Sequence, residues 1–382
     1  VKAKLEAKIA RLAGVANFDQ LSGAEELDLS DKGLASLPLR LGSFPLLRLS
    51  LGANRLKSLP PALLRLVTLT RLDLRANGLV ALPPEVGGLA ALEILKLSEN
   101  RLMLLPEELG RLVVLQELRL EGNQLAALPD SLGGLVVLTT LDASHNKLTC
   151  LPPSFGELAA LESLDLSGNR LATLPDAFGR LRALRDFVAS GNPLCALPAT
   201  FGDLASLQRL SLNSCYFPRL PSTFGSLTNL RTLELNRSHV EELPSSVGGL
   251  TSLRELEANG NRLSDLPDGF GALASLRRCE LKANHFKAIP QCVGALVDLE
   301  ELTLNENGLE VLPGFLAAFT KLRRLDLNGN ALVELPAAIA AGLSSLRSLD
   351  VRGTAIRTLP EPLHNHARLG LLSVLPSRLC SP

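Results

Sequence analysis

Hydrophobic and polar residues follow one pattern along most of this chain, and the pattern repeats every 23 residues. In residues 92–114, LEILKLSENRLMLLPEELGRLVV, leucines recur at fixed offsets around Asn100 and Pro106. The prolines keep this interval from Pro60 to Pro336 without an insertion. Such periodicity predicts a stack of equal units in place of a single globular core.

Each repeat contains an LxL segment, which predicts a short strand because side chains alternate between two faces at a period of two. The two leucines point into the stack, and the residue between them points to solvent. Successive coils return to the same edge, so the strands pair in parallel. The Leu-Pro step and the xxLGxL segment after it are too short for a full helix, and they predict a helical or 3-10 turn. Strands lie closer together than these wider returns, so the sheet lies on the concave face of a curved stack.

An asparagine follows each predicted strand at a fixed offset. Because its side chain both donates and accepts, stacked asparagines predict a buried ladder that satisfies backbone groups at the turns. Cys215 and Ser238 replace two of its members. The ladder positions are Asn54, Asn77, Asn100, Asn123, Asn146, Asn169, Asn192, Asn261, Asn284, Asn307 and Asn330.

The two ends of the chain lack the repeat. Within residues 1–23, Leu5 and Ile9 lie on one helical face, which predicts a helix that caps the first repeat; a basic helix on a membrane surface is the alternative. Residues 24–360 form the repeats, about 15 in number, and residues 361–382 form a C-terminal cap or tail. The predicted fold class is an α/β solenoid with a parallel sheet on its concave face and short helical or 3-10 turns on its convex face.

Composition and charge narrow the function. Basic and acidic residues balance, 39 against 39, so there is no overall attraction to nucleic acid. No phosphate-binding loop, metal-ligand spacing or nucleophile motif occurs, so no enzyme, cofactor or metal site is predicted. No apolar run predicts a membrane span. The six cysteines are scattered without a CxxC pair, which predicts a reducing compartment: the cytoplasm, with a cilium or flagellum as a narrower possibility.

The unit LxxLxLxxNxLxxLPxxLGxL resembles that of intracellular leucine-rich repeat proteins of the Ras-group type, which include the Ras–Raf scaffold and the repeat domains of polarity proteins. The resemblance covers about residues 24–360. It implies a non-catalytic adaptor in signalling, polarity or ciliary assembly, which acts as a monomer or as a subunit of a hetero-complex.

Function is expected in the exposed strand positions that the repeat leaves free. Two groups of like charge occupy them. The early repeats carry a basic group: Arg48, Arg71, Arg75, Lys96 and Arg119. The later repeats carry an acidic group: Glu234, Glu255, Glu257, Glu280 and Glu301. The alternative is that neighbours such as Arg209, Arg278 and Arg324 neutralise these charges and both groups are merely solvated.

A protein contact centred on Val188, Arg209, Tyr216, Glu234 and Arg237 is also predicted, because tyrosine and arginine are common binding anchors and both ladder replacements lie in these repeats. The leading hypothesis is a scaffold that binds a protein through its concave face. Two alternatives remain open: a structural subunit of a large assembly such as a ciliary axoneme, and the recognition domain of a larger enzyme.

Overall fold

A computed structural model describes residues 2–358, 360 and 371–373. The chain divides into two compact units, Val1–Asn192 and Pro193–Pro382. Both are built from the same coil, in which a strand, a turn and a short helix follow one another. The predicted solenoid is confirmed within each unit.

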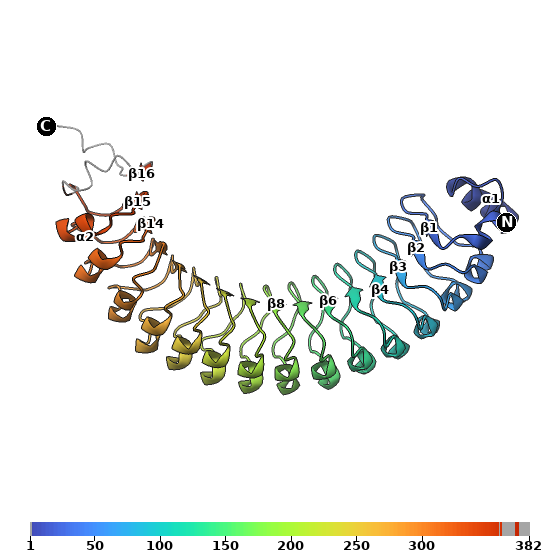
Figure 1. Ribbon diagram of the computed structural model, residues 1–382, viewed down its shortest axis with the longest axis horizontal. Helices are drawn as coiled ribbons and strands as arrows, with labels where there is room; N and C mark the ends of the chain where they lie inside the picture. Colours follow the sequence, from blue (N-terminus) through green and yellow to red (C-terminus); the bar gives the residue numbers. More distant parts are fainter. Residues whose placement is uncertain (1, 359, 361–370, 374–382) are drawn as a thin grey trace. The chain divides into compact units, whose positions relative to one another are not determined.

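In the first unit, strands β1 to β8 form a parallel sheet (Figure 1). Equivalent residues of successive repeats pair, so Leu72 lies beside Leu95 and Leu95 beside Leu118. The strands are β1 (Glu26–Asp28), β2 (Arg48–Ser50), β3 (Arg71–Asp73), β4 (Ile94–Lys96), β5 (Glu117–Arg119), β6 (Thr140–Asp142), β7 (Ser163–Asp165) and β8 (Asp186–Val188).

In the second unit, strands β9 to β16 pair in parallel in the same way. Leu233 lies between Leu210 and Leu256. The strands are β9 (Arg209–Ser211), β10 (Thr232–Glu234), β11 (Glu255–Glu257), β12 (Arg278–Glu280), β13 (Glu301–Thr303), β14 (Arg324–Asp326), β15 (Ser348–Asp350) and β16 (Leu371–Ser373).

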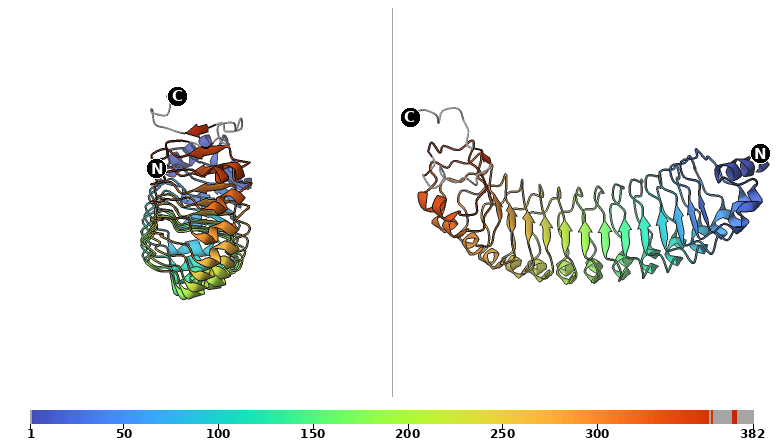
Figure 2. Two further views of the ribbon diagram at one scale, coloured as in Figure 1. Left: turned by 90° about the vertical axis from the view of Figure 1, so that its left-hand side faces the viewer. Right: turned by 45° about the horizontal axis from the view of Figure 1, so that its top comes forward.

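Within each unit the strands line the inner, concave side and the 3-10 helices lie on the outer side (Figures 1 and 2). From Pro38 to Pro336, a helix begins after each Leu-Pro step because proline fixes an extended entry, as at Pro106 with φ −73° and ψ 149°. The helices are η1 (Phe18–Gly23), η2 (Leu39–Ser43), η3 (Pro61–Arg65), η4 (Pro84–Gly88), η5 (Glu107–Arg111), η6 (Asp130–Gly134), η7 (Pro153–Glu157), η8 (Asp176–Arg180), η9 (Ala199–Asp203), η10 (Ser222–Ser226), η11 (Ser245–Gly249), η12 (Asp268–Ala272), η13 (Gln291–Ala295) and η14 (Gly314–Ala318).

The turn asparagines bond across successive repeats. Asn100 Oδ1 accepts from the backbone N–H of Leu79 at 3.1 Å, and its Nδ2 donates to the carbonyls of Leu74 and Leu97 at 2.9 Å each. The same set recurs at Asn123, one repeat later. Each asparagine therefore ties its own coil to the preceding one.

Serine maintains this link where asparagine is replaced. Ser238 is fully buried, and its Oγ donates to the carbonyl of Leu212 at 2.6 Å while accepting from the N–H of Cys215 at 3.4 Å. A hydroxyl bonds fewer groups than an amide, so the ladder is weaker here than at its asparagines.

An α-helix, α1 (Lys2–Leu12), precedes the first repeat. Ile9 and Ala10 are buried, whereas Leu5 and Leu12 are half-buried. The helix therefore buries one apolar face, as a cap does. The boundary of the capping segment at residue 23 stays a prediction.

The last repeats differ from the template in two ways. The extra residue before β15 widens the 3-10 turn into an α-helical one, α2 (Ala337–Gly342), in which Leu343 N–H donates to Ile339 O at 3.1 Å. Strand β16 extends the sheet beyond the predicted repeats and covers the open edge of β15. Apart from β16, the predicted C-terminal cap or tail, residues 361–382, lies outside the residues that the structure describes.

Candidate functional site

The early basic group gathers around an acidic residue. In the first unit, Lys96 Nζ lies 3.8 Å and Arg119 Nε 2.9 Å from Glu117 Oε1. Burial opposes ionisation of Glu117, but the Arg119 hydrogen bond and the charges of Lys96, Arg119 and Arg71 lower its pKa. Arg119 also lies 3.5 Å from Asp142.

Two more members of this group have partners of their own. Arg48 forms an ion pair with Glu26, and Arg75 Nε lies 3.1 Å from Asp73 Oδ2. Four of the five basic residues in this group therefore have an acidic neighbour, whereas Arg71 forms no ion pair among the described residues.

The later acidic group divides into two kinds of glutamate. Arg209 lies 3.0 Å from Glu234, and Arg278 lies 3.9 Å from Glu255 and 3.3 Å from Glu301. By contrast, Glu257 and Glu280 have no ion pair among the described residues, and both accept hydrogen bonds from side-chain amides.

These amides come from a second row of asparagines that the sequence analysis did not single out. Asn213, Asn236 and Asn259 occupy the position two residues after strands β9, β10 and β11. We call them the asparagine row. Their Nδ2 groups donate to the carboxylates of Glu234, Glu257 and Glu280, the glutamate row, at 2.9, 2.8 and 2.9 Å. A glutamate is therefore held by the repeat that precedes it.

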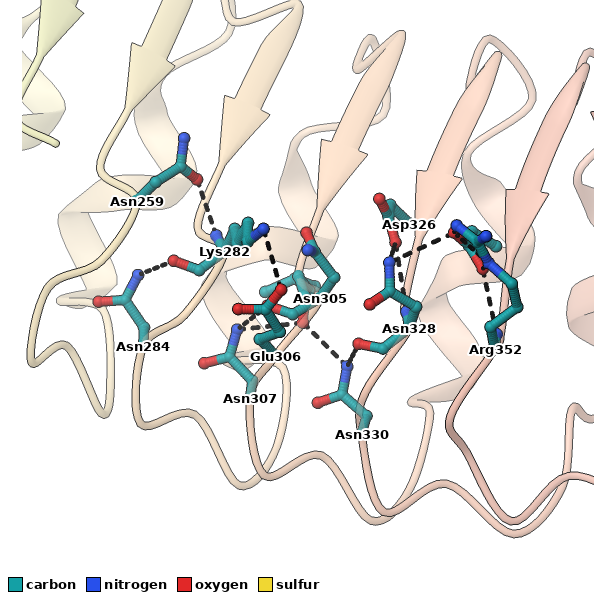
Figure 3. A network of polar contacts seen from close by, with 12 residues as sticks. Asn259, Lys282, Asn284, Asn305, Glu306, Asn307, Asp326, Asn328, Asn330 and Arg352 are labelled. Atoms are coloured by element: carbon teal, nitrogen blue, oxygen red, sulfur yellow. Dashed lines mark hydrogen bonds and ion pairs between the residues drawn. The ribbon is translucent and has the colours of Figure 1, made fainter. Parts of the chain in front are cut away.

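The asparagine row also accepts hydrogen bonds from the backbone of the next repeat. Its Oδ1 atoms accept from the N–H of the equivalent residue in the next repeat: Asn213 from Asn236 at 2.7 Å, Asn236 from Asn259 and Asn259 from Lys282 at 2.9 Å each. Figure 3 shows Asn259 pointing to the backbone of Lys282, whose side chain in turn points to Glu306, 2.9 Å away.

Aspartates perform this task elsewhere in the solenoid. Where an aspartate ends the strand, its own carboxylate accepts from the N–H two residues later, at 3.0 Å for Asp142 and 2.8 Å for Asp165. Asp326 does the same for Asn328 at 3.2 Å (Figure 3). Glutamates at this strand position in the second unit leave that N–H to the asparagine row. Their carboxylates are therefore not required to close the turn.

A shallow hollow of about 600 Å³ runs beside the asparagine row. Besides these amides, Arg237, Gly260, Lys282 and Glu306 line it. Arg237 is exposed, and no ion pair involves it within the described part of the chain.

Tyr216 and Val188 are not members of the glutamate row. Tyr216 follows the strand and ladder positions of its repeat, and its ring stacks on His239 with centroids 5.0 Å apart. It is 55% exposed, so the stacked pair is open to solvent on the flank of the second unit. Val188 is half-buried and belongs to the first unit.

The described residues give no sign of a metal site or a membrane span. No group of three or more His, Cys, Asp or Glu side chains among them is arranged to hold a metal ion. None of the helices in the same residues combines the length and hydropathy needed to cross a bilayer.

Comparison with family models identifies the repeats. A model described as "Leucine-rich repeat region" matches residues 199–303. A second, described as "Leucine rich repeat", matches residues 67–125, 137–194 and 298–356. No curated protein matches the chain by sequence.

Solved structures resemble the chain over most of its length. A leucine-rich repeat protein of Leptospira interrogans is 33% identical with a TM-score of 0.79, over 92% of this chain and 95% of that one. The effector YopM of Yersinia pestis is 28% identical with a TM-score of 0.67, over 88% and 86%. The plant peptide hormone receptor RGFR1, solved in complex with RGF2, is 26% identical with a TM-score of 0.78, over 92% of this chain and 59% of the receptor.

Proposed function

The chain belongs to the leucine-rich repeat family, and from this premise we propose that it is a non-catalytic scaffold that binds a protein partner through the strand face of its second unit. Proteins of this family and fold are generally interaction scaffolds. A plant receptor of the same fold has been solved with RGF2 bound. The Ras-group subclass, the signalling role and the cytoplasmic location expected from the sequence remain part of the proposal.

The observation that carries the proposal is the glutamate row. Three adjacent repeats hold a glutamate at the same position, about 4.8 Å apart, although like charges at this spacing destabilise a sheet. Glu257 and Glu280 are left without a cation in the described chain, and the turn does not use them. Fixed, unneutralised carboxylates on an exposed sheet favour a partner with basic residues.

A binding measurement tests this proposal. The probe is a short fluorescent peptide with arginines at alternate positions, and its affinity is read from fluorescence anisotropy in a salt series. We expect Glu257→Gln with Glu280→Gln to raise the Kd at least about tenfold, because glutamine keeps the shape and the bond to asparagine but removes the charge. The control is Glu85→Gln with Glu310→Gln, which removes two exposed charges elsewhere.

The outcome separates the candidate roles. Equal affinity of wild-type chain and the Glu257/Glu280 variant would refute the glutamate row as the binding surface. Wild-type affinity should fall steeply as salt rises, as expected for a reversible scaffold. A natural partner that stays bound at salt that releases the peptide would favour the structural subunit of an assembly.

A further inference from the structure

Three arginines lie at the edge of the sheet in the second unit, each one residue before a strand. The N–H of Arg254 donates to the carbonyl of Arg231, and the N–H of Arg277 donates to the carbonyl of Arg254, at 2.8 Å each. Their backbones are thus direct neighbours, and the three side chains start from the same position of consecutive repeats. We call them the arginine edge.

Two of these charges lack an ionic partner. Arg277 lies 3.5 Å from Asp298, and its Nη1 donates to the carbonyls of Ala274 and Leu276. Arg231 and Arg254 are exposed, and no ion pair within the described residues involves either one. Two like charges therefore start from adjacent backbone positions without an ionic partner, an arrangement that costs stability.

The fold does not require arginine at this position. In the first unit the residues one place before β4, β5 and β6 are Glu93, Gln116 and Thr139, and their backbones make the same hydrogen bonds at 2.8 and 2.9 Å. An uncompensated pair of arginines that the backbone does not need is a feature of surfaces that meet an anionic partner.

We propose that the arginine edge binds an extended acidic segment of a protein. This contact goes beyond the proposed function. The acidic segment would lie beside the partner's basic residues, which bind the glutamate row. Guanidinium groups suit carboxylates because the planar fork offers two parallel N–H donors.

The glutamate row argues against a broad polyanion such as duplex nucleic acid or a sulfated polysaccharide. Each arginine of the edge is three residues from a glutamate of the row, as with Arg231 and Glu234, so the two rows are about 10 Å apart along the strands. A duplex is wide enough to cover both rows and would be repelled by the carboxylates. A single extended chain is about 5 Å wide and covers the arginines alone.

Two labelled peptides test the inference on the full chain. The acidic probe carries glutamates at alternate positions, and the basic probe is the arginine peptide described above. We expect Arg231→Glu with Arg254→Glu to raise the Kd for the acidic peptide at least about tenfold and to leave the basic peptide bound. The charge-matched control is Arg65→Glu with Arg111→Glu, two exposed arginines on η3 and η5.

Circular dichroism shows whether each variant is folded. Arg231→Gln with Arg254→Gln is a milder second test, and we expect it to weaken binding of the acidic peptide less than the glutamate variant does. Unchanged affinity for the acidic peptide in both edge variants would overturn the inference, as would an equal loss in the control. Tighter binding of duplex DNA or heparin than of the peptide, lost in the edge variants, would also overturn it in favour of a polyanion. Failure of the glutamate row shows instead in the basic peptide alone, so the two proposals fail separately.

Discussion

Replacing one ladder asparagine tests how the coils are held together. In Asn100→Ala, the N–H of Leu79 loses its acceptor in a buried site. The carbonyls of Leu74, Leu97 and Ser98 also lose a donor, but each retains another, from Asn77, from Asn123 and from the N–H of Ala76 respectively. The ladder is therefore redundant for carbonyls and not for amides.

The magnitude follows from this count. One orphaned buried N–H costs about 1–3 kcal/mol, and each lost second bond to a carbonyl costs somewhat less, so we expect about 2–4 kcal/mol in total. Because solenoid stability is a sum of local terms, the loss should fall on the repeats around β3 to β5. Amide hydrogen exchange of peptides from these repeats measures it as a lower free energy of local opening.

Asn77→Ala is the matched control. Asn77 makes the same set of bonds from a half-buried position. Water can replace part of that set, so the loss should be smaller than in Asn100→Ala. An equal effect of both substitutions, or a change below about 0.5 kcal/mol in Asn100→Ala, would refute the view that an orphaned buried amide sets the cost.

Three further predictions concern single residues. Burial raises the pKa of Cys279 to about 12, so a thiol reagent at pH 8 should label exposed Cys150 quickly and Cys279 only on unfolding. In Gly110→Ala the new Cβ would clash with the carbonyl oxygen of Ser131 in the next repeat, so thermal unfolding should show a loss of about 1–3 kcal/mol, whereas Gly23→Ala, with open space, should change little. Burial, with a nearby carboxylate, raises the pKa of Asp326 above 3.8. The folded state thus loses stability as pH rises from 3.8 through that raised pKa, and urea midpoints of Asp326→Asn should lack this decline.

The sequence predicted the fold because every repeat shows the same pattern of structural residues. The leucines that alternate at a period of two, the asparagine after them and the Leu-Pro step each define one part of the coil. Strand β16 was missed, although Leu372 lies 23 residues after Leu349 and thus keeps the interval. Pro360 precedes Leu372 by the same interval as Pro106 precedes Leu118, but Ser377 stands at the asparagine position, and residues 361–382 were predicted as a cap or tail.

The candidate site was predicted only in part. The exposed strand positions included Glu234, Glu257 and Glu280, but charge alone did not distinguish these glutamates from Glu117, which lies among ion pairs. The distinction depends on residues that follow the strands. Asn236 and Asn259 accept from the backbone N–H groups two residues after Glu257 and Glu280, so these glutamates do not have to. The available signal was an asparagine that recurs two places after the strand. Its role follows only from the groups that its side chain donates to and accepts from.

The arginine edge was not predicted from the sequence, for a related reason. Its arginines precede the strands, whereas the repeat pattern predicts solvent-facing positions only within them. Arg231 and Arg254 gain significance because neither forms an ion pair in the described chain. Side-chain pairing of this kind depends on rotamers and neighbours, which a repeat pattern does not contain.

The most direct test of the central claim is a double-mutant cycle between Glu257 and one arginine of the basic peptide. Anisotropy gives the Kd for wild-type chain and Glu257→Gln, each with the arginine peptide and with a peptide in which that arginine is citrulline. If the glutamate row binds the partner's basic residues, at least one peptide position should show a coupling energy of about 1 kcal/mol or more. Additive effects at every arginine of the peptide would contradict the claim.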